Sequence, residues 1–414
     1  MAVGRNSLIA ALDVGTTKVC CFVARAEGDS GRVIGIGHQV SRGLRGGAVV
    51  DMEAAEQSIR AAVDAAERMA GETVHGIYVN LSGGSPSSHT IAVEVSVAGH
   101  QVDNADTYRV LDQAQARCDA GDNQLLHAIP TGYTIDGSRG IRDPRGMYGE
   151  RLGVNLHVVT AASGPMRNLQ VVTERCHLEI EDFVASAYAA GLATLVEDEM
   201  DLGVTLIDMG GGTTSIAIFY DGAMVHTDVV AIGGNHVTND LARGLSTPTI
   251  HAERIKALYG SAIASPEDER ELVAVPQVGE EGSDAVQQIP RSMLIGIIQP
   301  RIEETLELVR DRLQASGLAR LAGRRLVLTG GASQLTGVRE LAARVLDKQV
   351  RIGRPLKVRG LAEATGGPAF ATCTGLIAYA IRAPEEARRS ISAAGIEANG
   401  WRFARIGQWL RENF

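Results

Sequence analysis

The chain is poor in the features that mark secreted, nucleic-acid-binding and membrane-spanning proteins. Its five cysteines include no C-x-x-C pair, and their odd number argues against a disulfide framework. Lysine is scarce and the formal net charge is -9, which disfavours a general nucleic-acid binder because such a protein needs a basic surface. No apolar run is long enough to cross a bilayer, and no signal-type segment opens the chain. These absences predict a cytoplasmic protein with reduced thiols that binds no nucleic acid.

The apolar pattern predicts two similar α/β lobes, since 414 residues exceed the usual size of one domain. In the first half we expect strands at 8–12, 19–26, 33–40 and 77–81, with an amphipathic helix at 52–70. The second half repeats this order, with strands at 204–207, 215–220 and 224–230 and helices near 236–245 and 252–259. Strands followed by helices are typical of α/β layers, and the repetition indicates a duplicated fold.

A glycine-rich turn follows a buried strand at the corresponding place in each half. One reads Asp13-Val14-Gly15-Thr16-Thr17-Lys18, and the other reads Asp208-Met209-Gly210-Gly211-Gly212-Thr213-Thr214. Glycine lets backbone amides approach an anion closely, and threonine hydroxyls add donors. An aspartate that faces phosphates needs a hard cation such as Mg²⁺ between them. A single copy could equally be an ordinary hairpin turn, but two copies predict a clamp for a polyphosphate.

Three further segments depart from the repeated pattern. Residues 330–333 form a third glycine turn, between a strand at 326–329 and a helix expected at 335–346, and suit close approach to a base or ribose. Residues 84–162 carry strands at 91–97 and 156–160, a helix near 105–117 and several Gly/Pro turns, which indicates an inserted subdomain. Residues 265–288 are acidic and lack apolar periodicity, which predicts an exposed loop.

The C-terminal stretch has the pattern of a membrane-surface helix. After a helix expected at 370–382, residues 383–400 read as a flexible linker. On a helix spanning 401–414, one apolar stripe and its flank contain Trp401, Phe403, Ile406, Trp409, Leu410 and Phe414, with arginines outside it. The alternative is a helix packed against its own domain. Because ordering the tail offsets much of the roughly 1.5–3 kcal/mol gained per buried side chain, stable attachment would need several copies on one assembly.

With these three glycine motifs in this order, the chain resembles the actin, Hsp70 and sugar-kinase superfamily. The insert and the tail more narrowly resemble the bacterial FtsA family, and the likeness runs the length of the chain, including 248–259 and 351–356. It implies a two-lobed actin-like α/β ATPase fold with duplicated ribonuclease-H-like halves. The implied parts are a first-lobe core (1–83 and 163–200), an inserted α+β subdomain (84–162), a second-lobe core (201–232 and 302–382), a distal subdomain (233–301), a linker (383–400) and a membrane-targeting helix (401–414).

The resemblance further implies ATP and Mg²⁺ between the lobes. Asp13 and Asp208 would face the metal ion and its waters. The phosphates would be met from one side by Gly15, Thr16, Thr17 and Lys18, and from the other by Gly210, Gly211, Gly212, Thr213 and Thr214. Gly233, Gly234 and Asn235 would lie near the ribose and phosphates, while Glu253, Lys256, Gly330, Gly331, Ala332 and Ser333 would frame the nucleoside.

The same resemblance implies a cell division protein that polymerises at midcell on the cytoplasmic face of the bacterial inner membrane, as a peripheral membrane protein. It would tether the ring of the tubulin-like protein FtsZ to the membrane by binding the FtsZ C-terminal tail, and other divisome proteins would contact the inserted subdomain. We expect the distal part of the second lobe to bind the tail, with Arg301 as a basic contact to an acidic peptide. The alternative for Arg301 is a solvated residue in a first helical turn.

Hydrolysis is the step for which the likeness weakens. In the chaperone and filament relatives, a carboxylate or amide before an Ala-rich helix orients the attacking water, and here Ala185 takes that position. Alanine can position no water, so we predict no catalytic residue there and at most a weak ATPase, with ATP acting as a switch. A carbohydrate or acetate kinase is an alternative, but no convincing aspartate serves as its general base. A chaperone-like ATPase would need a substrate domain after the second lobe.

Overall fold

The computed structural model describes residues 7–118, 121–279 and 286–390, of which 383–390 are described by their backbone alone. The chain forms two compact units. Among the described residues, the first contains 7–90, 121–131 and 157–384 without 280–285, and the second contains 91–118, 132–156 and 385–390.

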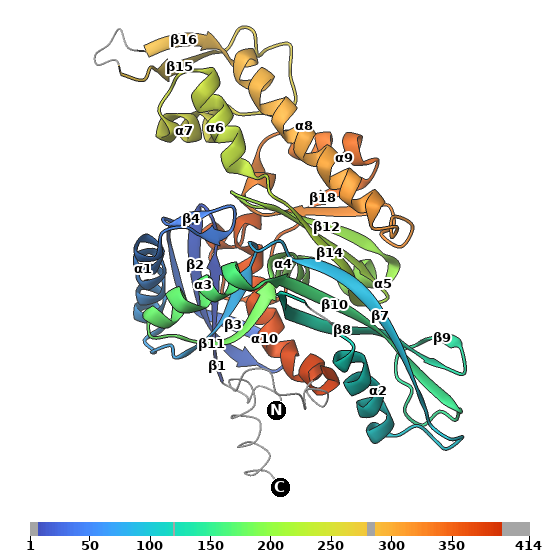
Figure 1. Cartoon of the computed structure of the whole chain (residues 1–414). Helices are drawn as coiled ribbons and strands as arrows, with labels where there is room; N and C mark the ends of the chain where they lie inside the picture. The colour runs from blue at the N-terminus through green and yellow to red at the C-terminus, as the bar shows by residue number, and fades with distance from the viewer. Residues whose placement is uncertain (1–6, 119–120, 280–285, 391–414) are drawn as a thin grey trace. The chain divides into compact units, whose positions relative to one another are not determined.

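Two sheets of corresponding topology organise the first unit (Figure 1). One has the order β11-β6-β1-β2-β3-β19, formed by Glu179–Ala185, Gly76–Leu81, Leu8–Val14, Lys18–Glu27, Ser30–Val40 and Val358–Arg359. The other has the order β14-β13-β12-β17-β18, formed by Ala223–Val230, Thr214–Tyr220, Val204–Met209, Arg325–Thr329 and Gln349–Ile352. In both, the opening strand pairs antiparallel with the next strand and parallel with a later one: β1 with β2 and β6, β12 with β13 and β17. The predicted duplication is therefore confirmed.

Helices pack on both sheets and bury their apolar faces there. Helix α1 (Met52–Ala70) covers β2 and β3 and has the predicted bounds, because the Asp51 carboxylate accepts hydrogen bonds from two first-turn amides and Gly71 takes a left-handed conformation with φ 69°. Helix α4 (Ser186–Thr194) is buried along its whole length and contacts strands of both sheets. The remaining helices of this unit are α3 (Ser163–Arg175), α5 (Glu197–Leu202), α6 (Gly234–Gly244), α7 (Thr249–Tyr259), α8 (Arg291–Ala315), α9 (Val338–Leu346) and α10 (Ala371–Ser390).

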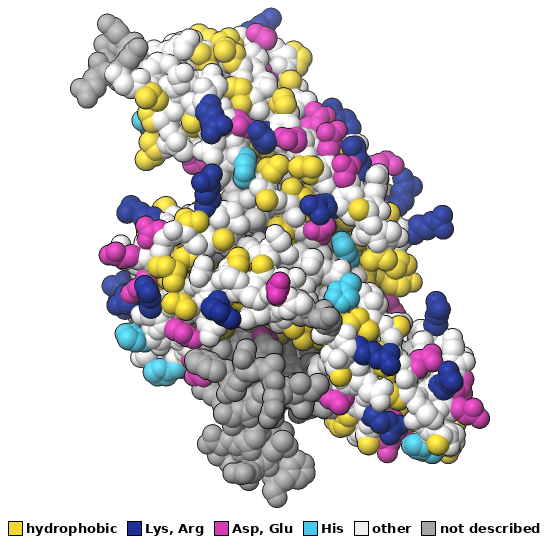
Figure 2. Space-filling view, viewed as in Figure 1, with side chains coloured by type: hydrophobic (Ala, Val, Ile, Leu, Met, Phe, Trp, Pro, Cys, Tyr) yellow, Lys and Arg dark blue, Asp and Glu magenta, His cyan; other side chains and the backbone are white. Residues whose placement is uncertain are grey.

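Acidic and basic side chains are interspersed on the face shown in Figure 2. All five cysteines are free, and Cys20, Cys21 and Cys373 are buried in one hydrophobic cluster. Within the described part of the chain, no helix combines the length and the apolar character that a membrane span requires.

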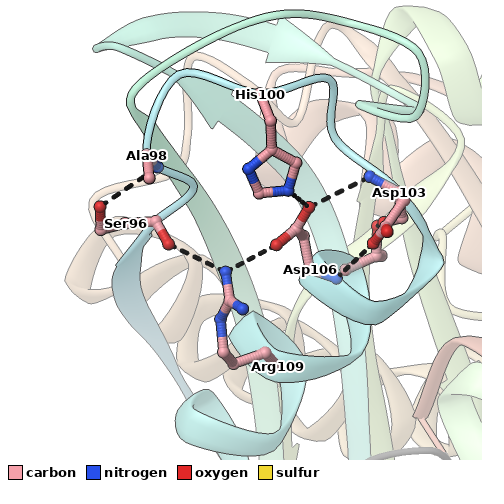
Figure 3. Close-up of polar contacts among 7 residues, drawn as sticks. Ser96, Ala98, His100, Asp103, Asp106 and Arg109 are labelled. Carbon is pink, nitrogen blue, oxygen red and sulfur yellow. Dashed lines mark hydrogen bonds and ion pairs between the residues drawn. The ribbon is translucent and has the colours of Figure 1, made fainter.

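The second unit contains part of a four-stranded sheet and the whole of one helix. The sheet has the order β7-β10-β8-β9, formed by Ser87–Ser96, Arg151–Ala162, Asn123–Ile135 and Ser138–Ile141. Helix α2 (Asn104–Ala116) starts with a capping box in which Asp103 and Asp106 each accept a hydrogen bond from the other's backbone amide. The buried Asp106 carboxylate also lies 2.9 Å from His100 Nε2 and accepts a 2.6 Å hydrogen bond from Arg109, so it fixes the loop before the helix (Figure 3).

The structure corrects several expected elements. Residues 265–288 are not all loop, because β15 (Leu272–Pro276) pairs with β16 (Val286–Pro290) and buries Val273 and Val275. The helix expected from residue 335 starts at Val338, after a 3₁₀ turn (Gly331–Gln334) and Gly337 with φ +79°. Helix α10 continues to Ser390, so the start of the expected linker is helical. The strand β8 and the hairpin partner β9 had not been expected.

Candidate functional site

A cavity of ≈ 460 Å³ lies in the first unit, where the turns after β1 and β12 approach one another. It is lined by most of the residues expected to hold a nucleotide: Asp13, Gly15, Thr16, Thr17, Lys18, Asp208, Gly210, Gly211, Gly212, Thr213, Gly234, Asn235, Glu253, Lys256, Gly330, Gly331 and Ala332. The three glycine-rich turns thus reach one pocket from segments that are more than a hundred residues apart in the chain.

The two phosphate turns have the same internal bond and touch each other. The amide of Gly15 donates to Lys18 O at 3.0 Å, and the amide of Gly210 donates to Thr213 O at 2.9 Å. A Cβ added at Gly211 would lie 2.4 Å from Thr17 Cγ2, so only glycine fits where the turns face each other. The turns therefore bring backbone amides and threonine hydroxyls of both lobes close together, where they could bind a polyphosphate.

Two buried aspartates, Asp13 and Asp208, lie near the carboxyl ends of the corresponding strands β1 and β12. Burial and the nearby Asp13 carboxylate raise the pKa of Asp208 to about 6, and burial raises the pKa of Asp13 against the opposing effect of Lys18. The Thr372 hydroxyl donates a 3.0 Å hydrogen bond to Asp208 Oδ2. Two carboxylates that repel each other in a buried site suit a hard divalent cation, which would relieve both effects.

The donor set around these aspartates is small. Among the residues described by the structure, no group of three or more His, Cys, Asp or Glu side chains could hold a metal ion by itself. A cation at Asp13 and Asp208 would therefore take its other ligands from phosphate oxygens and water, as Mg²⁺ does in nucleotide sites. The residues present fit Mg²⁺ bound together with a nucleotide.

Lys18 is held at the pocket wall by the segment before α10. Its ammonium donates a hydrogen bond to Ala369 O and lies 3.6 Å from the centroid of the Phe370 ring. The neighbouring carbonyl, Pro368 O, accepts hydrogen bonds from the Gly330 amide and the Thr329 hydroxyl of the second lobe. Residues 368–372 therefore connect both lobes to the floor of the pocket.

The expected nucleoside end is organised by a lysine on α7. Lys256 Nζ lies 2.7 Å from Glu253 Oε2 and donates to Thr238 Oγ1 at 2.8 Å and to Gly234 O at 3.2 Å. Gly330 has φ +85°, and a Cβ there would meet Asp208 Oδ1 at 2.3 Å, so the third turn also requires glycine.

Three of the expected nucleotide residues do not line the cavity, because their groups hold the turns in place. The Thr214 hydroxyl donates to Ile232 O at 2.8 Å. The Ser333 hydroxyl donates to Gly330 O at 2.7 Å. Gly233 lies behind the second-lobe turn, where an added Cβ would meet Gly210 O at 2.6 Å.

Sequence reasoning missed a polar wall supplied by the first lobe, formed by Asn80, Ser82 and Ser186, as well as Thr372 on α10. The amide of Val14, next to Asp13, donates to Asn80 Oδ1 at 2.7 Å, and Asn80 Nδ2 donates to Ser186 Oγ at 3.1 Å. The position of Asn80 at the carboxyl end of β6, beside β1, was a signal that could have found it, because parallel strands end at one edge of a sheet.

Ala185 is buried at the start of α4, and its amide donates to His127 Nε2 at 3.0 Å. Its side chain supplies no polar atom to the pocket.

Arg301 lies in the middle of α8, not in a first helical turn. Its guanidinium donates a 2.5 Å hydrogen bond to Asp240 Oδ2 and also pairs with Glu304, and the Asp240 carboxylate raises the pKa of Arg301. Two carboxylates of the chain itself therefore neighbour this arginine, and its contact with an acidic peptide stays a prediction. Trp401, Phe403, Ile406, Trp409, Leu410 and Phe414 lie outside the described residues.

Comparisons with known proteins agree on one family. The family model described as "Cell division protein FtsA" matches residues 205–375, and the one described as "SHS2 domain inserted in FTSA" matches residues 83–160. The chain is 48% identical to the cell division protein FtsA of Rhizobium meliloti over 99% of this chain and 96% of that protein. It is 38% identical to FtsA of Pseudomonas aeruginosa over the full length of both chains, and 33% identical to FtsA of Escherichia coli K12 over 99% of both.

Solved structures with the same fold include a chain of the PilM-PilN type IV pilus biogenesis complex, with a TM-score of 0.63 and 16% identity over 90% of this chain and 98% of that one. MreB5 of Spiroplasma citri bound to ADP has a TM-score of 0.54 and 14% identity over 92% and 99% of the respective chains. At these identities the likeness shows the fold alone, which is that of the actin-like ATPases.

Proposed function

This chain belongs to the FtsA family of cell division proteins, and from that premise we propose that it binds ATP with Mg²⁺ between its lobes and self-associates. We further propose that it tethers the FtsZ ring to the cytoplasmic face of the inner membrane at midcell. The observation that carries the proposal is the pair of facing glycine turns, each beginning with a buried aspartate. The actin-like cell division role follows from the family; the ligand, the partners and the membrane contact are the proposed part.

The pocket residues support ATP as the ligand. Backbone amides and hydroxyls from both lobes suit a polyphosphate, and Glu253 and Lys256 offer a carboxylate and an ammonium at the nucleoside end. A protein of the same fold, MreB5, has been solved with ADP. When bound, Mg²⁺ would neutralise phosphate charge beside Asp13 and Asp208, and Lys18 would exchange its bond to Ala369 O for one to a phosphate.

Slow hydrolysis follows from the chemistry at the start of α4. A water molecule attacks the terminal phosphate efficiently only when a carboxylate, amide or comparable group orients it and takes up its proton. Ala185 offers a methyl group in that place. We propose that ATP is held as a conformational switch and is turned over slowly.

The C-terminal sequence supports attachment to lipid. Residues 401–414 contain both tryptophans of the chain and place apolar residues on one helical stripe with arginines outside it. One such tail binds weakly, so tethering depends on several copies held in one filament. Self-association and membrane attachment are thus parts of one mechanism.

The other partners are assigned by subdomain. The distal subdomain of the second lobe, 233–301, is proposed to bind the FtsZ C-terminal tail near Arg301. Residues 330–333 of the same lobe would help to complete the nucleotide site. The inserted subdomain, 84–162, is proposed to contact further divisome proteins. A carbohydrate or acetate kinase of the same fold is not favoured, given the family of the chain.

Two measurements test this function. Isothermal titration of the purified chain with ATP and MgCl₂ should give saturable binding that EDTA weakens; absence of binding would remove the basis of the proposal. Co-sedimentation with vesicles containing anionic lipid should pellet the full chain with ATP, whereas a chain lacking residues 401–414 should bind ATP normally and stay in the supernatant. Equal pelleting of both chains would contradict the tether.

A further inference from the structure

The first-lobe wall of the nucleotide pocket carries a buried hydroxyl, that of Ser186, whose proton has no acceptor among the described residues. Glu253, Lys256 and Leu335 line the nucleoside end from the second lobe, whereas Asn80 and Ser186 line the cavity from the first lobe, next to the turn that starts at Asp13. In the proposed binding mode, with the base near Lys256 and the phosphates at the turn that starts at Asp13, the phosphate chain would lie beside this first-lobe wall.

Ser186 is held in one orientation by a chain of hydrogen bonds. The Val14 amide donates to Asn80 Oδ1 at 2.7 Å, which fixes the amide group so that its nitrogen faces Ser186. Asn80 Nδ2 then donates to Ser186 Oγ at 3.1 Å. From the other side, the bond from the Ala185 amide to His127 Nε2 fixes the backbone at the start of α4. The serine oxygen is therefore positioned before any ligand arrives.

The direction of these bonds determines what Ser186 can offer. Its oxygen accepts from Asn80, and within the described residues its own proton has no acceptor, although the residue is only 4% exposed. A buried hydroxyl whose proton has no hydrogen-bond acceptor is energetically unfavourable, and binding of an acceptor removes this cost. The cavity that it lines is the place where that acceptor can be bound.

We propose that the Ser186 hydroxyl donates a hydrogen bond to the terminal phosphate of ATP, and that the site distinguishes ATP from ADP through this bond. The inference rests on the proposed function, because it takes the pocket to be a nucleotide site. Asn80 is the positioning residue, since it orients Ser186 and is itself oriented by the backbone beside Asp13.

A hydrogen bond from Ser186 to the terminal phosphate agrees with the absence of a carboxylate at Ala185 and with the proposed role of ATP as a conformational switch. A neutral serine hydroxyl is too weak a base to accept the proton of an attacking water at neutral pH, so it binds the phosphate without acting as a general base. It stands one residue from Ala185, on the helix that contacts strands of both sheets. Binding of a terminal phosphate to Ser186 would therefore act directly on α4, the helix between the lobes.

The experiment compares ATP and ADP affinities of the full chain, measured by competition against a fluorescent adenine nucleotide in the presence of MgCl₂. Ser186→Ala should weaken ATP by about ten-fold, as expected for a hydrogen bond to a charged group, and leave ADP within about two-fold. Asn80→Ala should shift the ratio of the two affinities in the same direction by a smaller factor. Ser58→Ala, in the buried part of α1 and outside the pocket, is the matched control and should change neither.

The outcomes separate this inference from the proposed function. An unchanged ratio of ATP to ADP affinity in Ser186→Ala would overturn the role of Ser186 while leaving nucleotide binding intact. Failure of the unmodified chain to bind either nucleotide would overturn both. Ser186→Cys keeps a similar volume with a weak donor, and it must reproduce the selective loss of ATP affinity if the hydroxyl proton is responsible.

Discussion

Replacing Gly211 by alanine tests whether contact between the two glycine turns closes the nucleotide site. The added Cβ would lie 2.4 Å from Thr17 Cγ2, 2.8 Å from Thr17 Oγ1 and 3.2 Å from Thr17 Cβ. Rotating the threonine side chain cannot relieve all three contacts, because its Cβ and both branches take part. The turns must therefore move apart by about 1 Å to reach ordinary van der Waals separation.

The cost of this separation should appear in binding. Forcing an extra methyl group into a packed contact costs about 1–3 kcal/mol, which corresponds to about 5- to 150-fold in affinity for a ligand that needs both turns. The two hydrophobic cores lie outside the contact, since neither includes Gly211 or Thr17. We therefore expect weaker ATP binding with little change in the free energy of unfolding.

Titration with a fluorescent adenine nucleotide and urea denaturation measure the two quantities. Thr17→Ala removes the two closest atoms, so Gly211→Ala should cost less affinity in that background than in the unmodified chain. Gly164→Ala is the matched control, because a Cβ there meets no atom within 4 Å. If Gly211→Ala binds ATP as tightly as the unmodified chain, the turns do not close on the ligand as inferred.

Three further predictions concern buried charge. Burial and the neighbouring His226 and His89 lower the pKa of His157 from 6.5 to about 3. At pH 5 this imidazole is therefore protonated in the unfolded chain but neutral in the folded one. The free energy of unfolding should consequently fall by about 2 kcal/mol between pH 7 and pH 5. His157→Leu should flatten this dependence in urea titrations, and an unchanged slope would contradict the assignment. EDTA should weaken ATP binding by the unmodified chain but have little further effect on Asp208→Asn, and equal sensitivity in calorimetry would argue against a metal ion at Asp208. Arg351 donates to both oxygens of the buried Glu199 carboxylate, so Arg351→Met should lower the free energy of unfolding by about 1–3 kcal/mol, and a change below about 0.5 kcal/mol would show that the pair is not structural.

Exposed counterparts provide controls for two of these variants. His75 is exposed, so His75→Leu should leave the slope of stability against pH unchanged. Arg339 pairs with Glu340 at the surface, with 57% and 49% of the two side chains exposed, and Arg339→Met should change the free energy of unfolding by less than about 0.5 kcal/mol.

Local signals predicted the elements whose ends are set by neighbours in the chain. Helix α1 begins and ends where expected because an aspartate caps one end and a glycine the other. The Asp221-Gly222 turn joins β13 to β14 as expected, with φ +50° and +78°. Residues 272–276 were missed because the alternation that buries Val273 and Val275 covers only five residues and gains its meaning from pairing with β16.

The amino-acid sequence alone determined the duplicated strands and the glycine turns, because backbone freedom and strand pattern act over a few residues, and these features include the three turns that meet in the nucleotide pocket. Only the tertiary structure brought Asn80 within hydrogen-bonding reach of Val14 and Ser186, which are 66 and 106 residues away from it in the chain. The physical reason is the order of strands in the sheet. Parallel neighbours such as β6, β1 and β11 are joined by crossovers, and their shared edge exists only after the first-lobe sheet has assembled.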